Sequence, residues 1–267
     1  MKVACIQLSS SENYNKNFKE ILNYINIAIA EKSDFIITPE TSSIITDNTK
    51  KLFKFSYEMK NDPLIKELKK IAKNKRKWIM IGSLPIKSGK KLRNRSILIN
   101  SFGKIVKYYD KINMFDVKVS KKENHNESKI YKAGTKLVFA NTPWGKLGVT
   151  ICYDIRFPHL YRHLAQKGAI FFTVPAAFAR STGKSHWHTL IRARAIENSC
   201  YIFAAAQCGD HGEGWFTYGH SLIVDPWGKV LVDGGDKIGF IAVEIDVELV
   251  EQTRRRIPSI FSDQAFT

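Results

Sequence analysis

Short apolar runs that alternate with amphipathic segments predict one α/β domain with mixed sheets. The chain has 267 residues and is 44% hydrophobic, which is enough for a substantial core and excludes a disordered or collagen-like chain. Short buried runs between helices are typical of parallel strands, whereas apolar pairs joined by turn residues are typical of hairpins. No repeat, low-complexity tract or linker divides the chain, so a single domain is expected.

In the N-terminal half, strands are predicted from alternating or continuous apolar runs and helices from apolar residues three and four positions apart. Pro39 ends the second strand, and the turn at residues 101–104 joins a hairpin. In order, the expected elements are strand Lys2–Leu8, helix Glu12–Glu31, strand Asp34–Thr38, helix Pro63–Lys75, strand Trp78–Leu84, and a hairpin of Ser96–Asn100 with Ile105–Tyr109.

The C-terminal half repeats this alternation after a polar stretch, Asp116–Lys136, that is expected to be a loop. A second loop, Gly209–Phe216, is glycine-rich, and it is expected to be flexible and to lie near a pocket. The expected elements are strand Lys146–Cys152, helix Pro158–Gln166, strand Ala169–Val174, helix Ser185–Ser199, strand Tyr201–Ala206, a hairpin of Tyr218–Asp225 with Val230–Asp233, strand Phe240–Ile245, and a helix through about Arg256.

The formal net charge of +17 is confined to one stretch of the sequence. Residues Lys50–Lys122 hold 22 Lys and Arg against 5 Asp and Glu, and 19 of the 22 cations are Lys. Arg rather than Lys is favoured where bases or phosphates are read in a bidentate manner. The stretch lacks a helix-turn-helix signature, a Cys/His finger and the aromatic ribonucleoprotein motif. A solvated surface is therefore expected, with nucleic-acid binding as the alternative from a different functional class.

The remaining composition indicates a cytoplasmic protein. The four cysteines form no C-x-x-C pair and no secreted-scaffold spacing, which is typical of free thiols in a reducing compartment. The chain enters its first strand without a signal-peptide pattern. The longest apolar stretch, Ala169–Ala179, is about half of the roughly 20 residues that span a bilayer, so no membrane partner is expected.

Three ionisable residues follow predicted strands, where α/β folds place their sites. They are Glu40, Lys111 and Cys152. Each has a non-catalytic alternative: Glu40 could cap a helix, Lys111 could be a surface lysine, and Cys152 could be a small, buried apolar side chain. Together they are a complete set for acyl transfer: the carboxylate takes the thiol proton, and the ammonium stabilises both the thiolate and the oxyanion that forms. That chemistry requires neither histidine nor metal.

These residues lie in motifs that resemble the nitrilase, or carbon–nitrogen hydrolase, superfamily. The resemblance runs from residue 3 to about residue 258, and its motifs stand in the family's order at Thr38–Glu40, Tyr109–Ile112 and Cys152–Pro158. It implies a four-layer α-β-β-α sandwich over residues 1–267. It also implies a homo-oligomer assembled through the helices near the nucleophile and the C-terminal segment.

Within this superfamily the chain most resembles the deaminated-glutathione amidase branch, through the motifs Thr182–Trp187, Arg192–Asn198, Ala204–Gly209 and Tyr218–Gly228. The implied activity is hydrolysis of a small carboxylate-bearing linear amide, foremost deaminated glutathione, with release of ammonia or an amine. The ω-amidase branch, which hydrolyses α-ketoglutaramate, matches less well around residues 204–209, and nitrile hydrolysis is a weaker option. Asn113 and Ser185 depart from the pattern, where relatives commonly have His and Ala.

The resemblance also assigns roles around the triad. Glu127 falls at the family's second glutamate, and the backbone N–H of Tyr153 joins Lys111 in binding the oxyanion. Arg156 is a candidate for holding a substrate carboxylate, although a structural role beside Asp154 fits equally. Phe178 and Thr182 are candidate pocket residues for which core or loop packing is an equal alternative.

No cofactor or metal is expected at this site. His159 and His163 are spaced as two metal ligands on one helix face, but no H-E-x-x-H motif accompanies them. His186 and His188 are likewise unassigned. Gly183-Lys184-Ser185 follows a strand as a phosphate-binding loop would, yet Phe178 stands where that motif requires its first glycine.

Overall fold

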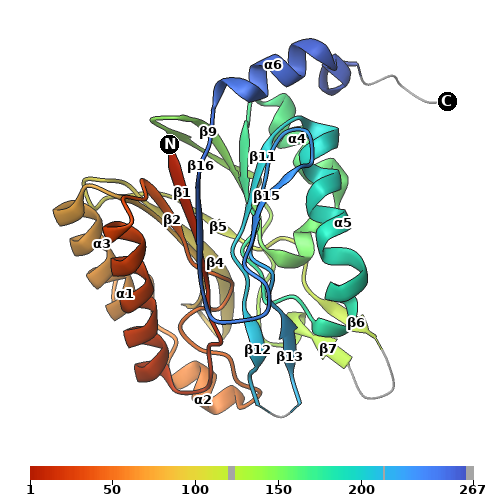
Figure 1. Cartoon of the computed structure of the whole chain (residues 1–267). Helices are drawn as coiled ribbons and strands as arrows, with labels where there is room; N and C mark the ends of the chain where they lie inside the picture. The colour runs from red at the N-terminus through yellow and green to blue at the C-terminus, as the bar shows by residue number, and fades with distance from the viewer. Residues whose placement is uncertain (120–123, 213, 263–267) are drawn as a thin grey trace.

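Two six-stranded β-sheets pack face to face in the protein, with helices on both outer sides (Figure 1). The structure is a computed structural model that describes residues 1–119, 124–212 and 214–262. None of the helices in these described ranges is long and apolar enough to cross a membrane. The helices are α1 (Tyr14–Ala30), α2 (Thr49–Lys54), α3 (Pro63–Lys75), α4 (Pro158–Gln166), α5 (Arg180–Asn198), α6 (Glu248–Arg256) and the 3₁₀ helices η1 (Glu127–Lys129), η2 (Cys152–Arg156) and η3 (Pro258–Phe261).

The first sheet takes its strands from both ends of the chain. Its central strands β1, β2 and β3 are parallel, whereas β4, β5 and β16 are antiparallel to their neighbours. In spatial order the strands are β16 (Gly239–Glu244), β1 (Lys2–Gln7), β2 (Phe35–Ile37), β3 (Trp78–Ser88), β4 (Lys91–Ile99) and β5 (Ile105–Asp110).

The second sheet repeats that plan in the other half of the chain. Strands β9, β10 and β11 are parallel, and β8, β14 and β15 pair with antiparallel registers. Its order is β15 (Val230–Asp233), β14 (Leu222–Val224), β11 (Tyr201–Ala204), β10 (Phe171–Thr173), β9 (Gly145–Val149) and β8 (Val138–Thr142). Two hairpins stand apart from it: β6 (Asp116–Lys118) with β7 (Asn124–Asn126), and β12 (Cys208–Asp210) with β13 (Phe216–Tyr218).

The predicted four-layer α-β-β-α sandwich is confirmed. Alternate residues of β1 enter different cores: Val3 and Cys5 face the second sheet, while Ala4 and Ile6 face the outer helices. Helices α1 and α3 cover the outer face of the first sheet, and α4 and α5 cover that of the second (Figure 1). Between the sheets, the ring centroids of Phe35 and Phe203 lie 6.3 Å apart.

Most predicted elements are present, and helices Pro63–Lys75 and Pro158–Gln166 have the expected bounds. Local chemistry explains the first of these. The side chain of Asp62 accepts a hydrogen bond from the N–H of Ile65 at 3.0 Å, Pro63 occupies the first turn, and Arg76 adopts a left-handed conformation at the end.

Four expectations were wrong in detail, and two elements were missed. Cys152 does not end a strand but opens η2, and α5 begins at Arg180 rather than Ser185. The stretch 116–136 contains β6, β7 and η1, although residues 120–123 lie outside the described residues. The stretch 209–216 contributes to the β12–β13 hairpin, and residue 213 is likewise not described. Helix α2 and strand β8 had not been expected from the sequence.

Candidate active site

The three residues predicted to form a triad meet at one end of the sandwich. Glu40 follows β2 and Lys111 follows β5 in the first sheet, while Cys152 follows β9 in the second. All three side chains are buried. The Nζ of Lys111 lies 2.9 Å from Oε1 of Glu40, and the charges of both residues act on the thiol of Cys152. The cluster therefore requires both sheets.

Glu40 is held by donors from three directions. Its Oε1 accepts hydrogen bonds from Nδ2 of Asn94 at 2.8 Å and from Lys111 at 2.9 Å. Its Oε2 accepts one from the backbone N–H of Ala177 at 2.8 Å, which comes from the loop after β10. These bonds fix the carboxylate beside the thiol and satisfy the charge that burial would otherwise make costly.

Glu127 joins the cluster as the resemblance implied. Its Oε2 lies 2.8 Å from Nζ of Lys111 and accepts a hydrogen bond from the backbone N–H of Phe115 at 2.7 Å. Its Oε1 accepts a hydrogen bond from Asn94 at 2.9 Å. Asn94 thus bridges two carboxylates through one amide nitrogen, a role that the sequence analysis missed because a lone Asn inside a strand carries no motif.

The pKa shifts set the charge of the resting site. Burial would raise the pKa of Glu40, but the Lys111 ammonium and the hydrogen bond from Ala177 outweigh it, and the pKa falls below its ordinary 4.5. Burial and then the charge of Glu40 hold the pKa of Cys152 well above its ordinary value. Burial would lower the pKa of Lys111, yet Glu127 and Glu40 raise it. At rest the groups are a carboxylate, a neutral thiol and an ammonium.

The backbone around Cys152 presents the thiol to the cavity. Cys152 has a φ of +44°, in the left-handed region that residues other than glycine rarely adopt. Its N–H donates to the carbonyl of Pro175 at 2.9 Å. Tyr153 lies in the first turn of η2, where backbone N–H groups have no partner within the helix. This geometry places an N–H beside the nucleophile.

A buried carboxylate, Asp154, fixes the turn that carries Cys152. It accepts hydrogen bonds from the hydroxyl of Tyr109 at 2.7 Å and from the N–H of Ile151 at 2.9 Å. It also accepts bonds from the side chain and backbone N–H of Asn113 at 2.8 and 3.0 Å. Asn113, one of the two departures from the family pattern, therefore supports the nucleophile's turn and does not enter the cluster.

A cavity of about 640 Å³ opens over the cluster and contains Glu40, Lys111, Cys152 and Glu127 in its wall. The hairpins β6–β7 and β12–β13 lie at this end of the sandwich (Figure 1). The wall is mixed in character: aromatic residues meet cations from the first turns of α5. Among its members are Phe178, Thr182, Arg180, Lys184, Trp215 and Phe216.

The predicted substrate residues take two different positions. Phe178 and Thr182 line the cavity, as does Tyr153. Arg156 is absent from the described lining residues. Its guanidinium carbon lies 5.3 Å from the ring centroid of Phe178, and its Nη2 lies 3.2 Å from Nδ1 of His186. Arg180 and Lys184 also line the cavity. Neither was predicted as a substrate residue, and Lys184 was considered only as part of a phosphate-binding loop.

This arrangement can perform acyl transfer. A neutral thiol beside an ionised carboxylate has its base in place, and the ammonium next to both can stabilise negative charge as it forms on a substrate oxygen. Burial strengthens each of these electrostatic interactions relative to water.

Comparisons with known proteins agree with this chemistry. Residues 2–255 match the carbon–nitrogen hydrolase family. The deaminated glutathione amidase of Yersinia enterocolitica is 38% identical over 263 residues, which cover 96% of this chain and 90% of that protein. The protein of the same name from Dictyostelium discoideum is 39% identical over 261 residues, covering 94% and 90%.

A solved structure has the same arrangement of elements. The crystal structure of Saccharomyces cerevisiae Nit3, described as a member of branch 10 of the nitrilase superfamily, superposes with a TM-score of 0.88 at 30% identity. The alignment covers 99% of this chain and 96% of the yeast protein. The resemblance inferred from three short motifs therefore extends over the whole fold.

Proposed function

The chain belongs to the carbon–nitrogen hydrolase family, and on that premise we propose that residues 1–267 form one domain that hydrolyses a small carboxylate-bearing amide through a thioester on Cys152. The observation that carries the proposal is the presence of three buried groups, the Glu40–Lys111 ion pair and Cys152, in the wall of one cavity. The reaction as proposed uses no metal or cofactor.

In the first half-reaction, Glu40 takes the proton of Cys152 as the sulfur attacks the amide carbon. The carbonyl oxygen becomes an oxyanion, which receives hydrogen bonds from Lys111 and from the N–H of Tyr153. An ammonium has three N–H donors. Two are directed at Glu40 and Glu127, and the third serves the oxyanion. Glu40 then protonates the leaving nitrogen as the C–N bond breaks, and a thioester remains.

In the second half-reaction, water attacks the thioester while Glu40 accepts one of its protons. The same donors stabilise the second oxyanion. The C–S bond breaks, Glu40 returns the proton to the sulfur of Cys152, and the carboxylic acid product leaves. Glu127 is proposed as a positioning residue, because it contacts Lys111 and Asn94 and holds the ammonium at this point.

The proposed substrate is deaminated glutathione, with ω-amidase activity on α-ketoglutaramate as the alternative. A cavity of about 640 Å³ lies in the range of sites for ligands of tripeptide size. Two cations, Arg180 and Lys184, line it, and they suit a substrate with a carboxylate at each end. Thr182 and Phe178 complete the proposed pocket, with Arg156 behind Phe178 as a further candidate for carboxylate binding.

The direct test compares deaminated glutathione with α-ketoglutaramate as substrates of the full chain. Hydrolysis of either amide releases α-ketoglutarate, which is measured as the product. We expect a higher kcat/KM for deaminated glutathione. Cys152→Ala is expected to lose turnover while it retains the thermal transition of the parent. Lys111→Met is also expected to lose turnover, with a lower thermal transition because Glu40 and Glu127 lose their buried cation. Steady-state hydrolysis by Cys152→Ala, or an unchanged kcat/KM in Lys111→Met, would contradict the triad assignment.

Mass spectrometry tests the thioester independently of rate. A slow amide substrate, quenched in acid during turnover, should add its acyl mass to the peptide that contains Cys152. An adduct on another peptide, or a burst of product without any adduct, would argue for a different nucleophile.

A homo-oligomer is proposed from the family resemblance and from one exposed apolar patch. Ile196 of α5, Trp227 of the β14–β15 turn and Ile257 after α6 are all exposed. Gly228 packs directly against Ile196, and the guanidinium of Arg256 lies over the Trp227 ring at 4.8 Å, so the β14–β15 turn joins α5 to the end of α6. Sedimentation should show that Trp227→Glu dissociates the assembly, whereas Phe102→Glu, at an exposed aromatic on the β4–β5 turn, leaves it intact.

The proposed location is the cytoplasm, with no nucleic-acid or membrane partner. All four cysteines are buried and free, which supports a reducing compartment. If DNA or RNA binding persisted near about 0.15 M salt with a steep salt dependence, the basic stretch would have a function of its own.

A further inference from the structure

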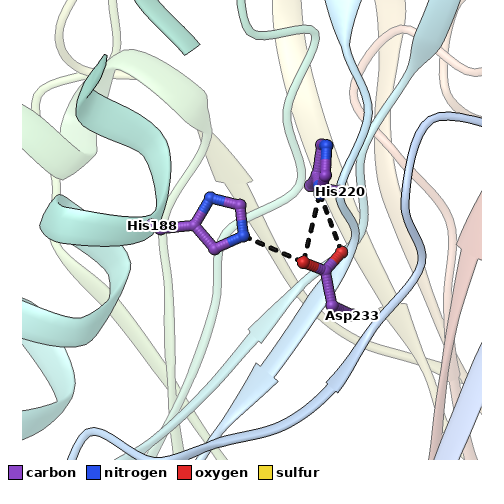
Figure 2. A group of neighbouring side chains, drawn as sticks. All are labelled: His188, His220 and Asp233. Carbon is purple, nitrogen blue, oxygen red and sulfur yellow. Dashed lines mark hydrogen bonds and ion pairs between the residues drawn. The ribbon is translucent and has the colours of Figure 1, made fainter. Parts of the chain in front are cut away.

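Outside the catalytic cavity, two histidines and one carboxylate converge on one point of the surface (Figure 2). His188 comes from α5, His220 from the segment between β13 and β14, and Asp233 from the end of β15. Nε2 of His188 lies 2.9 Å from Oδ2 of Asp233, and Nδ1 of His220 lies 2.9 Å from Oδ1 and 3.1 Å from Oδ2. None of the three lines the catalytic cavity.

Each of the three residues is fixed by its own surroundings. The backbone of His220 donates to the carbonyl of Gly235 and accepts from Nε1 of the buried Trp187 at 2.7 Å. The imidazole of His220 stacks on Tyr218 with ring centroids 4.4 Å apart. Asp233 accepts a hydrogen bond from the N–H of Gly235 through Oδ1 at 2.9 Å, which leaves lone pairs of Oδ2 directed at the histidines. His188 follows Trp187 in the helix.

The three ligand atoms have the chemistry and spacing of a divalent metal site. One ring nitrogen of each histidine and one oxygen of Asp233 all lie within 4.8 Å of one another. Bonds to zinc are about 2.0–2.2 Å long, so ligand atoms around a tetrahedral ion are about 3.4 Å apart. Small adjustments of partly exposed side chains are enough to reach that geometry. In the described part of the chain, no other His, Cys, Asp and Glu group meets the same criterion.

We propose that His188, His220 and Asp233 form a binding site for a zinc-like divalent transition metal, distinct from the catalytic centre. Two imidazoles with one carboxylate favour zinc, cobalt or nickel over magnesium or calcium, which prefer oxygen ligands. Each imidazole turns a lone pair to the ion and carries its proton on the other nitrogen. The remaining coordination position is left to water, because all three side chains are partly exposed.

Such an ion would join three elements that are far apart in sequence. It would tie the third turn of α5 to the end of β15 and to the segment before β14. The first turns of the same helix carry Arg180, Thr182 and Lys184 into the catalytic cavity. The expected consequence is a rise in thermal stability on metal binding, because only the folded chain brings the three ligands together.

The test titrates zinc into metal-free protein in competition with a chromophoric chelator. Cys152→Ser serves as the parent chain, since its active-site thiol could otherwise bind zinc. We expect one zinc ion to bind per chain. Cobalt(II) bound in place of zinc should show the visible absorption of a four-coordinate ion. His188→Gln and Asp233→Asn should each weaken zinc binding roughly 10- to 100-fold or more, and the rise in Tm with zinc should disappear in both.

His163→Gln is the matched control, because it removes an exposed histidine from another helix, α4, by the same substitution. It should bind zinc as the parent does. The proposal is overturned if the parent binds no zinc, or if His188→Gln and Asp233→Asn bind it with the affinity of the parent. Circular dichroism of the metal-free variants establishes that loss of binding is not loss of fold.

Discussion

At the scale of single residues, Glu40 must accept a proton from a group that holds it tightly. Lys111 and Ala177 stabilise the carboxylate, which makes it a weak base, while burial and Glu40 itself disfavour the thiolate. A free transfer of the proton is therefore unfavourable at rest. We infer that the transfer occurs together with attack on the substrate, when Lys111 gains an oxyanion to stabilise.

Glu40 has two effects: its charge raises the pKa of Cys152, and its carboxylate is the base in the reaction. Replacing Glu40 by Gln separates them. Burial is the largest cause of the high pKa of Cys152, and the charge of Glu40 is the next. Without that charge, the effect of Lys111 on the sulfur is opposed only by the weaker effect of Glu127, so the pKa of Cys152 should fall. Amide hydrolysis should nevertheless drop by roughly 10²- to 10⁴-fold, because the base is lost.

Ultraviolet absorbance of the thiolate as a function of pH measures this change. The Glu40→Gln, Cys152→Ser double variant supplies the background from the other three cysteines. A pKa that stayed level or rose in Glu40→Gln would contradict the electrostatic account of the site.

Asn94 provides a second prediction at this scale. Its amide nitrogen donates hydrogen bonds to both Glu40 and Glu127. In Asn94→Leu, each of these two carboxylates loses that hydrogen bond. Hydrogen bonds to charged groups contribute about 1.5–3 kcal/mol, and kcat should fall roughly 10- to 100-fold. Steady-state kinetics check this. An Asn94→Leu enzyme that folds and keeps its kcat would show that the bridge is dispensable.

From the sequence, candidate site residues could be identified where a motif exists. Glu40, Lys111 and Cys152 were identified because each stands in a recognisable local pattern after a strand. Asn94 lies between Arg93 and Arg95 in a strand, and its function arises only when two distant carboxylates fold against it. No local signal marks such a residue.

At the scale of elements, the start of α5 shows how tertiary packing overrides local preference. Thr182 and Gly183 suggested a loop, yet both are helical. A Cβ at Gly183 would lie 2.4 Å from Cβ of Tyr218, so the glycine allows the close approach of α5 to β13.

The hairpin β6–β7 was missed for a different reason: its strands are short and polar, and they lack the apolar alternation that identifies a strand.

Gly183→Ala tests this packing. In an exposed helix, alanine in place of glycine is stabilising by up to about 1 kcal/mol. Here the added methyl group must displace Tyr218, and we expect a net loss of about 1–3 kcal/mol in the free energy of unfolding. Urea denaturation measures the change. Ser185→Ala, at an exposed position of the same helix, is expected to be neutral or slightly stabilising, and a stabilised Gly183→Ala would refute the close contact.

At the scale of the whole molecule, the charge of +17 is a property of one part of the chain. Of its cations, only Lys111 has a proposed task in catalysis. We propose that the others contribute a general positive field that attracts anions. Length and composition predicted a single α/β domain, but the division into two sheets came only from the family resemblance, because the pairing of strands depends on contacts between distant segments.

Ionic strength tests that field. Raising the salt from about 0.05 M to about 0.5 M should lower kcat/KM for a dicarboxylate amide several-fold through KM, with kcat nearly constant. A neutral amide measured under the same conditions is the control. An equal decrease for both substrates would show that salt acts on the enzyme and that steering has no part in it.

The pairing of β1 with β16 has a consequence for synthesis of the protein. Strand Lys2–Gln7 finds its antiparallel neighbour only when residues 239–244 have been made. Until then the growing chain carries an open strand edge, which is a template for unwanted pairing with other chains. Lys111 and Glu40 are made early but belong to a sheet that closes late. Enzymatic activity should therefore arise only after residues 239–244 have been made, and a chaperone that shields exposed strands should increase the yield.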